Sequence, residues 1–239
     1  MVELTIDGKR VEAEEGRTIL EVARQIGVEI PTLCWSEGIS PYGACRLCMV
    51  EVEEGGRRRL VASCIYQVKD GLVVETATER VQRVRRMVME MLLARCPRSE
   101  AVRKMARELG VEATRLEERP PEEDEGCILC GLCVRACREV VGLNAIGFAF
   151  RGSKRMVAPP FDEPPTLCIG CGTCAYVCPT GCIPFEDKGD KRIIWNREFE
   201  MQKCRVCGTY FAPVAQLAYI SQKTGLPLDY LEVCPDCRK

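Results

Sequence analysis

Alternating apolar and polar positions in the first third of the chain predict a small β-rich domain, residues 1–78. The stretch VELTIDGKRVEAE predicts a hairpin that turns at Asp7-Gly8, and RLCMVEVEEGGRRRLVAS predicts a second that turns at Gly55-Gly56. Between the hairpins, GRTILEVARQIGV has the spacing of a helix, with Thr18 as its N-cap and Gly27 near its end.

The apolar spacing then changes to the period of a helix, and residues 79–126 predict a helical connector. The expected apolar face of its first helix, residues 79–95, consists of Val81, Val84, Val88, Met91 and Leu92. A second helix is expected over 99–109, with Ser99 as N-cap and Gly110 as C-cap. These helices either brace two domains or complete a local core. An acidic, Pro-containing linker follows at 116–126.

Composition narrows the chemistry, because the 239 residues include 18 Cys and no His. The absence of His excludes Ser-His and Cys-His nucleophiles, His-bound zinc and a Rieske centre. Most Cys lie at Cys-x2-Cys spacing, which is typical of metal ligands and not of a disulfide scaffold. The net charge of −1 gives no reason to expect binding to nucleic acid or to an anionic membrane surface. The apolar runs are only a few residues long, so we expect no membrane span, and the start of the sequence does not have the pattern of a signal peptide. We expect a cytoplasmic protein.

The first set of cysteines has the spacing Cys34-x10-Cys45-x2-Cys48-x15-Cys64 and lies within the β-rich segment. Four thiolates are what a [2Fe–2S] cluster needs, and small residues at Gly43 and Ala44 allow backbone N–H groups to approach the sulfurs. The spacing differs from the plant type, Cys-x4-Cys-x2-Cys.

The second set repeats one pattern, since CILCGLCVRAC at 127–137 and CIGCGTCAYVC at 168–178 are both Cys-x2-Cys-x2-Cys-x3-Cys. This is the pattern of bacterial two-cluster ferredoxins, in which the fourth Cys of each run ligates the other cluster. We therefore expect a 2[4Fe–4S] ferredoxin domain at 127–198. Its cluster A would be held by Cys127, Cys130, Cys133 and Cys178, and its cluster B by Cys168, Cys171, Cys174 and Cys137.

The third set lies in the last segment, 199–239, as Cys204-x2-Cys207-x26-Cys234-x2-Cys237. Two facing Cys-x2-Cys pairs make a tetrahedral S4 site, which predicts a zinc-ribbon-like module. Zinc is favoured over a further iron–sulfur cluster, and that alternative stays open. Cys96 and Cys182 fall outside all three sets, and we expect both to be packing residues.

The first set resembles the [2Fe–2S] domain that opens the large iron–sulfur subunit of complex I, iron-only hydrogenases and NAD-linked nickel–iron hydrogenases. Residues 1–187 together resemble the small, diaphorase-side iron–sulfur subunit of bidirectional or electron-bifurcating hydrogenases and related formate dehydrogenases. The resemblance implies an α+β chain with a β-grasp [2Fe–2S] domain. The sequence departs from the complex I pattern, because it lacks the further motif of one His and three Cys.

That resemblance implies a non-catalytic electron-transfer subunit, and the tail is a further departure from the family. From the cysteine sets we expect one [2Fe–2S] cluster, two [4Fe–4S] clusters and one Zn²⁺. The partners of such a subunit would be an NAD(P)H-oxidising FMN flavoprotein subunit, hydrogenase or formate dehydrogenase subunits, and ferredoxin. The sequence shows no dinucleotide fingerprint, P-loop or flavin motif, so we expect no substrate site. Two alternatives stay open: a free-standing polyferredoxin that shuttles electrons, and a zinc-ribbon interaction module with redox-sensing clusters.

Overall fold

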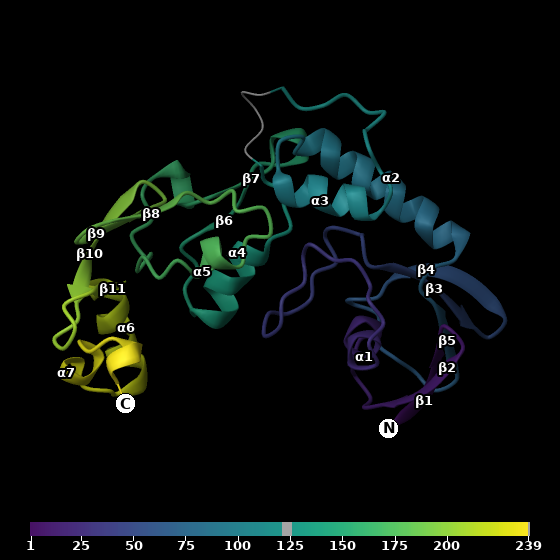
Figure 1. Ribbon diagram of the computed structural model, residues 1–239, viewed down its shortest axis with the longest axis horizontal. Helices are drawn as coiled ribbons and strands as arrows, with labels where there is room; N and C mark the ends of the chain where they lie inside the picture. The colour runs from purple at the N-terminus through teal and green to yellow at the C-terminus, as the bar shows by residue number, and fades with distance from the viewer. Residues whose placement is uncertain (121–125, 239) are drawn as a thin grey trace. The chain divides into compact units, whose positions relative to one another are not determined.

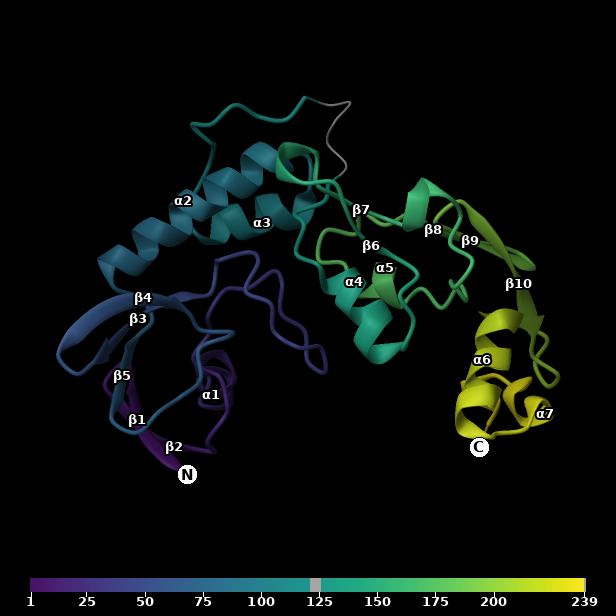
Figure 2. The ribbon, with the colours of Figure 1, turned by 180° about the vertical axis from the view of Figure 1, so that it is seen from behind.

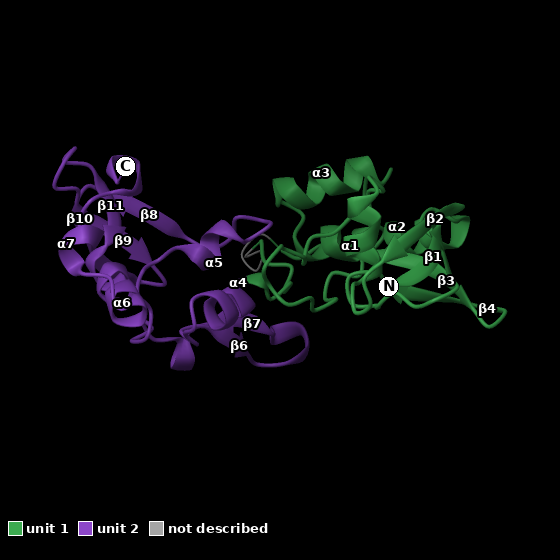
Figure 3. Ribbon diagram, turned by 90° about the horizontal axis from the view of Figure 1, so that it is seen from below, with its two compact units in different colours: residues 1–132 green, residues 133–239 purple. Residues whose placement is uncertain are grey.

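The computed structural model describes residues 1–120 and 126–238. The chain divides into two compact units, residues 1–132 and 133–239, which are coloured separately in Figure 3 and are described one at a time below. Part of the predicted acidic linker, residues 121–125, lies outside the described residues. The domain boundaries expected at 78, 126 and 198 remain predictions.

The first unit is built on a five-stranded mixed sheet with the strand order β2-β1-β5-β3-β4. The central strands β1 and β5 run parallel, while the other neighbours pair antiparallel. The sheet curves around the helix α1, as Figure 1 shows, and this arrangement is a β-grasp. The elements are β1 (Val2–Ile6), β2 (Lys9–Ala13), α1 (Ile19–Gln25), β3 (Met49–Glu54), β4 (Arg57–Ala62) and β5 (Leu72–Glu75).

Both predicted hairpins are confirmed, and their turn geometry explains why the sequence indicates them. Asp7 and Gly8 have φ angles of 47° and 79°, and Gly55 and Gly56 have 57° and 74°. Two consecutive positive φ angles define the two-residue turn whose twist matches paired strands, and Asp-Gly and Gly-Gly favour it.

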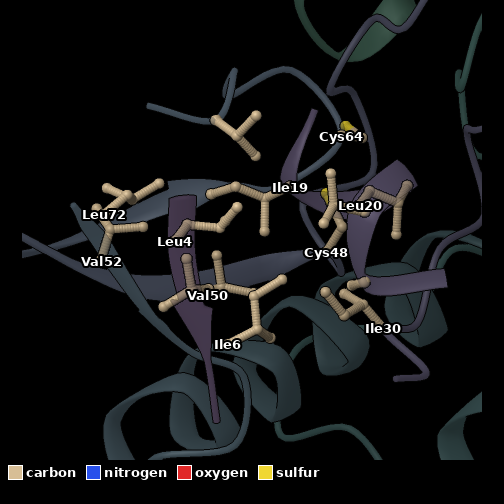
Figure 4. Packing of buried hydrophobic residues seen from close by; sticks show 14 of the residues in the cluster. Leu4, Ile6, Ile19, Leu20, Ile30, Cys48, Val50, Val52, Cys64 and Leu72 are labelled. Carbon is tan, nitrogen blue, oxygen red and sulfur yellow. The ribbon is translucent and has the colours of Figure 1, made fainter. Parts of the chain in front are cut away.

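The core of the first unit lies between the sheet and α1, as Figure 4 shows. The buried face of α1 packs against strand residues that point to one side of the sheet, and Cys48 and Cys64 belong to the same core. Each Leu or Ile buried in this way contributes roughly 1.5–3 kcal/mol. The largest members are Leu4, Ile6, Ile19, Leu20 and Leu72.

A capping box starts α1, as the sequence predicts for Thr18. The Thr18 hydroxyl accepts a hydrogen bond from the Glu21 backbone N–H at 3.3 Å, and the Glu21 carboxylate accepts one from the Thr18 backbone N–H at 2.8 Å. Two N–H groups that the helix cannot bond are thereby satisfied.

Two further helices complete the first unit, α2 (Glu79–Arg95) and α3 (Glu100–Glu108), and they lie side by side in Figure 1 and Figure 2. The predicted apolar face of α2 was correct at Val81, which is buried, and wrong further along the helix, where Val84 and Val88 are half-buried and Met91 is exposed. The face that packs on β3 and α3 is centred about one residue further along the chain, and its buried members are Val81, Arg85, Met89, Leu93 and Ala94.

The second unit contains short helices around two small sheets. One sheet pairs β6 with β7, and the other has the order β11-β10-β9-β8, with every pair antiparallel. Its elements begin with α4 (Leu132–Arg135), at the boundary of the units, the π-helix η2 (Ala136–Val140), β6 (Gly147–Ala149), the 3-10 turns η3 (Gly152–Lys154) and η4 (Pro160–Asp162), β7 (Met156–Ala158) and α5 (Thr173–Tyr176).

The rest of the second unit is the four-stranded sheet and the helices that follow it. These elements are β8 (Phe185–Lys188), β9 (Lys191–Ile194), β10 (Arg197–Lys203), β11 (Tyr210–Pro213), α6 (Val214–Thr224), α7 (Leu228–Leu231) and the 3-10 turn η5 (Pro235–Cys237). Among the helices in the described part of the chain, none combines the length and apolarity needed to cross a membrane.

Candidate metal centres

The structure brings the four cysteines of the first set to one end of the β-grasp sheet. Cys34 and Cys45 lie on the loop between α1 and β3, Cys48 directly precedes β3, and Cys64 follows β4. The hairpin register explains the last two positions, since Met49 pairs with Ala62 and the Ser63 N–H donates to the Cys48 carbonyl at 3.0 Å. All four side chains are buried, at 5% exposure or less.

Hydrogen bonds to sulfur show that this loop is built for thiolates. The Cys45 N–H points at Cys34 Sγ and the Leu33 N–H at Cys45 Sγ, both at 3.5 Å. Contacts with the Cys45 and Cys64 thiols lower the pKa of Cys34 to about 2, and the Cys64 thiol lowers the pKa of Cys48 to about 6. The same contacts raise the pKa of the Cys45 and Cys64 thiols, so these two donate to the sulfurs of Cys34 and Cys48.

A buried arginine supports this loop, and the sequence pattern did not predict it. Arg85, on α2, donates from Nε and Nη2 to the Met49 carbonyl at 3.2 and 2.8 Å, next to Cys48. Burial lowers the pKa of its guanidinium. The only signal in the sequence is that Arg85 stands at four-residue spacing between Val81 and Met89.

In the second unit, one pocket is lined by Cys137, Cys168, Cys171 and Cys174, the four residues predicted for cluster B. We call it the B pocket. Its other walls are mainly apolar, including Ile146 and Ile194. An apolar pocket with four convergent thiols is the donor set that a [4Fe–4S] cluster requires.

Backbone and side-chain donors already point at the sulfurs of the B pocket. The Gly170 N–H lies 3.4 Å from Cys168 Sγ, and the Thr173 hydroxyl lies 3.3 Å from Cys171 Sγ. The pKa of Cys137 is raised by burial, while backbone N–H groups of Ala145 and Ile146 oppose that rise. These donors fit a negatively charged cluster, because they offset the cost of burying it.

The ligands predicted for cluster A are divided between the units. Cys127 and Cys130 belong to the first unit and Cys133 and Cys178 to the second, so this grouping stays a prediction from spacing. Within the second unit, Cys178 Sγ lies 3.6 Å from Cys182 Sγ, and that contact lowers the pKa of Cys178 to about 5.

The two cysteines left outside the predicted sets occupy different surroundings. Cys96 is 1% exposed and caps the end of α2, a packing position. Cys182 is half-buried and packs against the core of the second unit, where it touches a predicted ligand, Cys178.

The four cysteines of the tail lie close together. Their sulfurs all lie within 4.8 Å of one another, and Cys207 Sγ is 3.8 Å from Cys234 Sγ. Cys204 follows β10, and Cys237 ends the turn η5. The turn after Cys204 closes through Gly208, whose φ is 77° and whose N–H donates to the Cys204 carbonyl at 3.0 Å.

Backbone donors also stabilise a thiolate in the tail. The N–H groups of Cys234 and Val206 lie 3.3 and 3.4 Å from Cys204 Sγ. Hydrogen bonds from the backbone of Cys234 and then Cys207 lower the pKa of Cys204 to about 6. The site is therefore ready to bind a cation through sulfur.

Two family models match the chain. Residues 1–79 match the 2Fe-2S iron-sulfur cluster binding domain, and residues 164–183 match the 4Fe-4S binding domain. The chain thus carries an iron–sulfur domain of each kind, as the cysteine spacing predicts.

Several curated proteins are similar to most of this chain. The NADPH-Fe(3+) oxidoreductase subunit alpha of Geobacter sulfurreducens is 36% identical over 87% of this chain and 27% of its own length. The NADP-reducing hydrogenase subunit HndD of Solidesulfovibrio fructosivorans is 36% identical over 77% of this chain and 36% of its own. One subunit of an NADH-quinone oxidoreductase from Rhizobium meliloti is 32% identical over 87% of this chain and 27% of its own. The chain therefore spans about a third or less of these curated relatives.

A solved structure agrees with these relatives. A chain of the NAD+-reducing [NiFe]-hydrogenase in the H2-reduced state is 29% identical, with a TM-score of 0.67, over 75% of this chain and 85% of that one. The resemblance inferred from the cysteine spacing, to iron–sulfur subunits of NAD(P)-linked hydrogenases and of complex I, is confirmed.

Proposed function

We propose that this chain is an electron-transfer subunit of an NAD(P)-linked oxidoreductase complex. It relays single electrons between an NAD(P)H-oxidising FMN flavoprotein subunit and a hydrogenase or formate dehydrogenase module, or ferredoxin. The observation that carries the proposal is the presence, in one chain, of a [2Fe–2S] domain and the B pocket. The likeness to a chain of an NAD+-reducing hydrogenase supports the choice of partners.

In this proposal each protein group has a defined task. Cys34, Cys45, Cys48 and Cys64 hold the [2Fe–2S] cluster, and the B pocket holds one [4Fe–4S] cluster. Cys127, Cys130, Cys133 and Cys178 hold the second [4Fe–4S] cluster. Bound clusters supply one-electron chemistry, while the protein excludes water and aims N–H groups at sulfur. No bond is made or broken in the chain, because each electron enters from one partner and leaves to the other.

For the tail we propose a single Zn²⁺ ion that helps to hold the chain to a neighbouring subunit. Four sulfurs at about 2.3 Å from one tetrahedral ion lie about 3.8 Å apart, and Cys207 Sγ and Cys234 Sγ are separated by 3.8 Å. A cluster would spread its ligands further, since different iron atoms bind them. Zn²⁺ does not change its oxidation state and could not relay electrons, so we assign the four-cysteine site a structural role.

Metal analysis and EPR of the anaerobically purified chain test the assignment. We expect about ten irons and one zinc per chain, with one [2Fe–2S] signal and two [4Fe–4S] signals after reduction. About fourteen irons without zinc would overturn the tail assignment, and absence of the [4Fe–4S] signals would overturn the relay. Purification under gentle conditions tests the complex: a chain that emerges alone supports the diffusing polyferredoxin instead.

A further inference from the structure

The turn between β9 and β10 places an aromatic donor at the B pocket. Trp195 and Asn196 have φ angles of 52° and 56°, a conformation that is uncommon for residues other than Gly, Asn and Asp. A bulky residue held there carries backbone strain, which often marks a functional position. Trp195 lines the same pocket as the four cysteines.

The indole N–H of Trp195 is buried and has no hydrogen-bond partner among the described residues. A buried donor without a partner is destabilising, because it has lost its hydrogen bond to water. Cys174, one of the four predicted ligands, lines the same pocket as Trp195. A cluster bound by Cys174 would supply sulfur acceptors beside this N–H.

The same hairpin fixes the backbone around the first cysteine of the second ferredoxin-like run, Cys168. Arg197, at the start of β10, donates from Nη1 to the carbonyls of Pro165, Thr166 and Cys168 at 2.6, 2.9 and 3.0 Å. These three bonds place the guanidinium charge of Arg197 at the backbone of a predicted ligand, Cys168.

A second arginine holds the next turn of this loop. Arg192, on β9 and 8% exposed, donates to the Gly170 carbonyl at 3.2 Å, and it also binds the Asp187 carboxylate at 2.6 and 2.8 Å. Two adjacent strands therefore anchor the segment 165–171, which carries two ligands of the B pocket.

We propose that the β9–β10 hairpin raises the reduction potential of the [4Fe–4S] cluster in the B pocket. Trp195 donates a hydrogen bond to cluster or cysteine sulfur, and Arg197 is a positioning residue that fixes the ligand loop and adds positive charge. Reduction adds one negative charge to the cluster, so both groups stabilise the reduced form more than the oxidised form. The inference rests on the proposed function, because it requires that cluster.

The test is an EPR-monitored redox titration of the full chain, purified anaerobically, with Trp195→Phe as the main variant. This change keeps an aromatic ring and removes the N–H, so we expect one [4Fe–4S] midpoint to shift to lower potential. The other [4Fe–4S] midpoint should stay in place. Trp35→Phe, the same change in the other unit, should leave both [4Fe–4S] midpoints unchanged. The proposal would be overturned if neither [4Fe–4S] midpoint shifts in Trp195→Phe, or if both shift by the same amount.

Arg197 provides a second test if Trp195→Phe does not retain its cluster. Arg197→Gln should lower the same midpoint and speed iron loss to a chelator, whereas Arg197→Lys should keep the charge and recover part of the potential. Lys191→Gln removes an exposed cation paired with Glu198 in the same hairpin and should change neither. An Arg197→Gln midpoint equal to that of the unaltered chain contradicts the proposal.

Failure of the proposed function and failure of the hairpin's role give different results. If the unaltered chain lacks two [4Fe–4S] signals, the proposed function fails. If both signals are present and the variants do not move one of them, only the role of the hairpin fails.

Discussion

Two glycines in the B-pocket loop stand where aromatic rings leave no room for a side chain. A Cβ on Gly170 would lie 2.7 Å from the Phe199 ring, and one on Gly172 would lie 2.6 Å from the Phe185 ring. The guanidinium groups of two arginines lie over the same rings, Arg197 at 4.8 Å from the Phe199 centroid and Arg192 at 4.4 Å from the Phe185 centroid. The sheet therefore contacts the loop through rings as well as through hydrogen bonds.

Gly170→Ala should consequently destabilise the second unit. Gly170 has φ of 70°, which strains any L side chain, and the new methyl would also clash with Phe199. Gly189→Ala is the matched control, because Gly189 has φ of 61° but open space around it. We expect Gly170→Ala to cost about 1–3 kcal/mol more than the control, measured by urea unfolding under anaerobic conditions. Equal costs would mean that the ring contact does not constrain the loop.

At the scale of secondary-structure elements, two helices begin in different ways although both were expected to have side-chain caps. Thr18 forms a complete capping box on α1, whereas Ser99 occupies the N-cap of α3 without a side-chain cap hydrogen bond. The Ser99 hydroxyl is buried and has no partner among the described residues. A Ser at the N-cap position of a helix therefore does not guarantee a hydrogen bond from its side chain to the helix.

Because only Thr18 caps its helix, we expect replacement by Ala to have different effects at Thr18 and at Ser99. Thr18→Ala should lower the free energy of unfolding by about 1 kcal/mol, because it removes an N-terminal cap. Ser99→Ala should be neutral or slightly stabilising, because it removes a buried hydroxyl that has no acceptor. Thermal unfolding of the two variants under identical cluster loading measures the effect. A loss for Ser99→Ala as large as that for Thr18→Ala would contradict the absence of a cap at Ser99.

Elements whose determinants are local were predictable from the sequence. Asp7-Gly8 and Gly55-Gly56 encode their turns, and cysteine spacing predicted the group that lines the B pocket. The β9–β10 turn was not predicted, since Trp195-Asn196 lacks the glycine that marks such turns. The face of α2 was misplaced because Arg85 is buried there by its bonds to the Met49 carbonyl, and hydrophobic periodicity counts an arginine as exposed.

At the scale of the whole chain, arginines from outside the cysteine motifs bond to carbonyls inside them. Arg85 binds the carbonyl of the residue that follows Cys48, Arg95 binds the Cys127 carbonyl at 2.8 Å, and Arg197 binds the Cys168 carbonyl. Arginine suits this task because it stays charged and offers several donors in a fixed plane. Such contacts join residues 29 to 36 positions apart in sequence, so spacing within a motif cannot reveal them.

The tail is joined to the B pocket through one strand. Phe199, which covers Gly170, lies on β10, and Cys204 directly follows the end of that strand. The proposed zinc site could therefore stabilise the cluster loop or serve only contacts with a neighbouring subunit. Phe199 and Met201 are buried, so β10 has its own packing independent of the metal. We expect the second role.

Replacing Cys204 and Cys237 together with Ser tests this expectation. The double variant should lose one zinc per chain and dissociate more readily from its complex during gel filtration, because two of four ligands are gone. The EPR signals and midpoints of the three clusters should stay unchanged. Cys96→Ala, which alters a buried cysteine outside every ligand set, should retain the zinc and the complex. If the double variant instead loses an EPR signal or shifts a midpoint, the tail participates in electron transfer or supports the cluster loop.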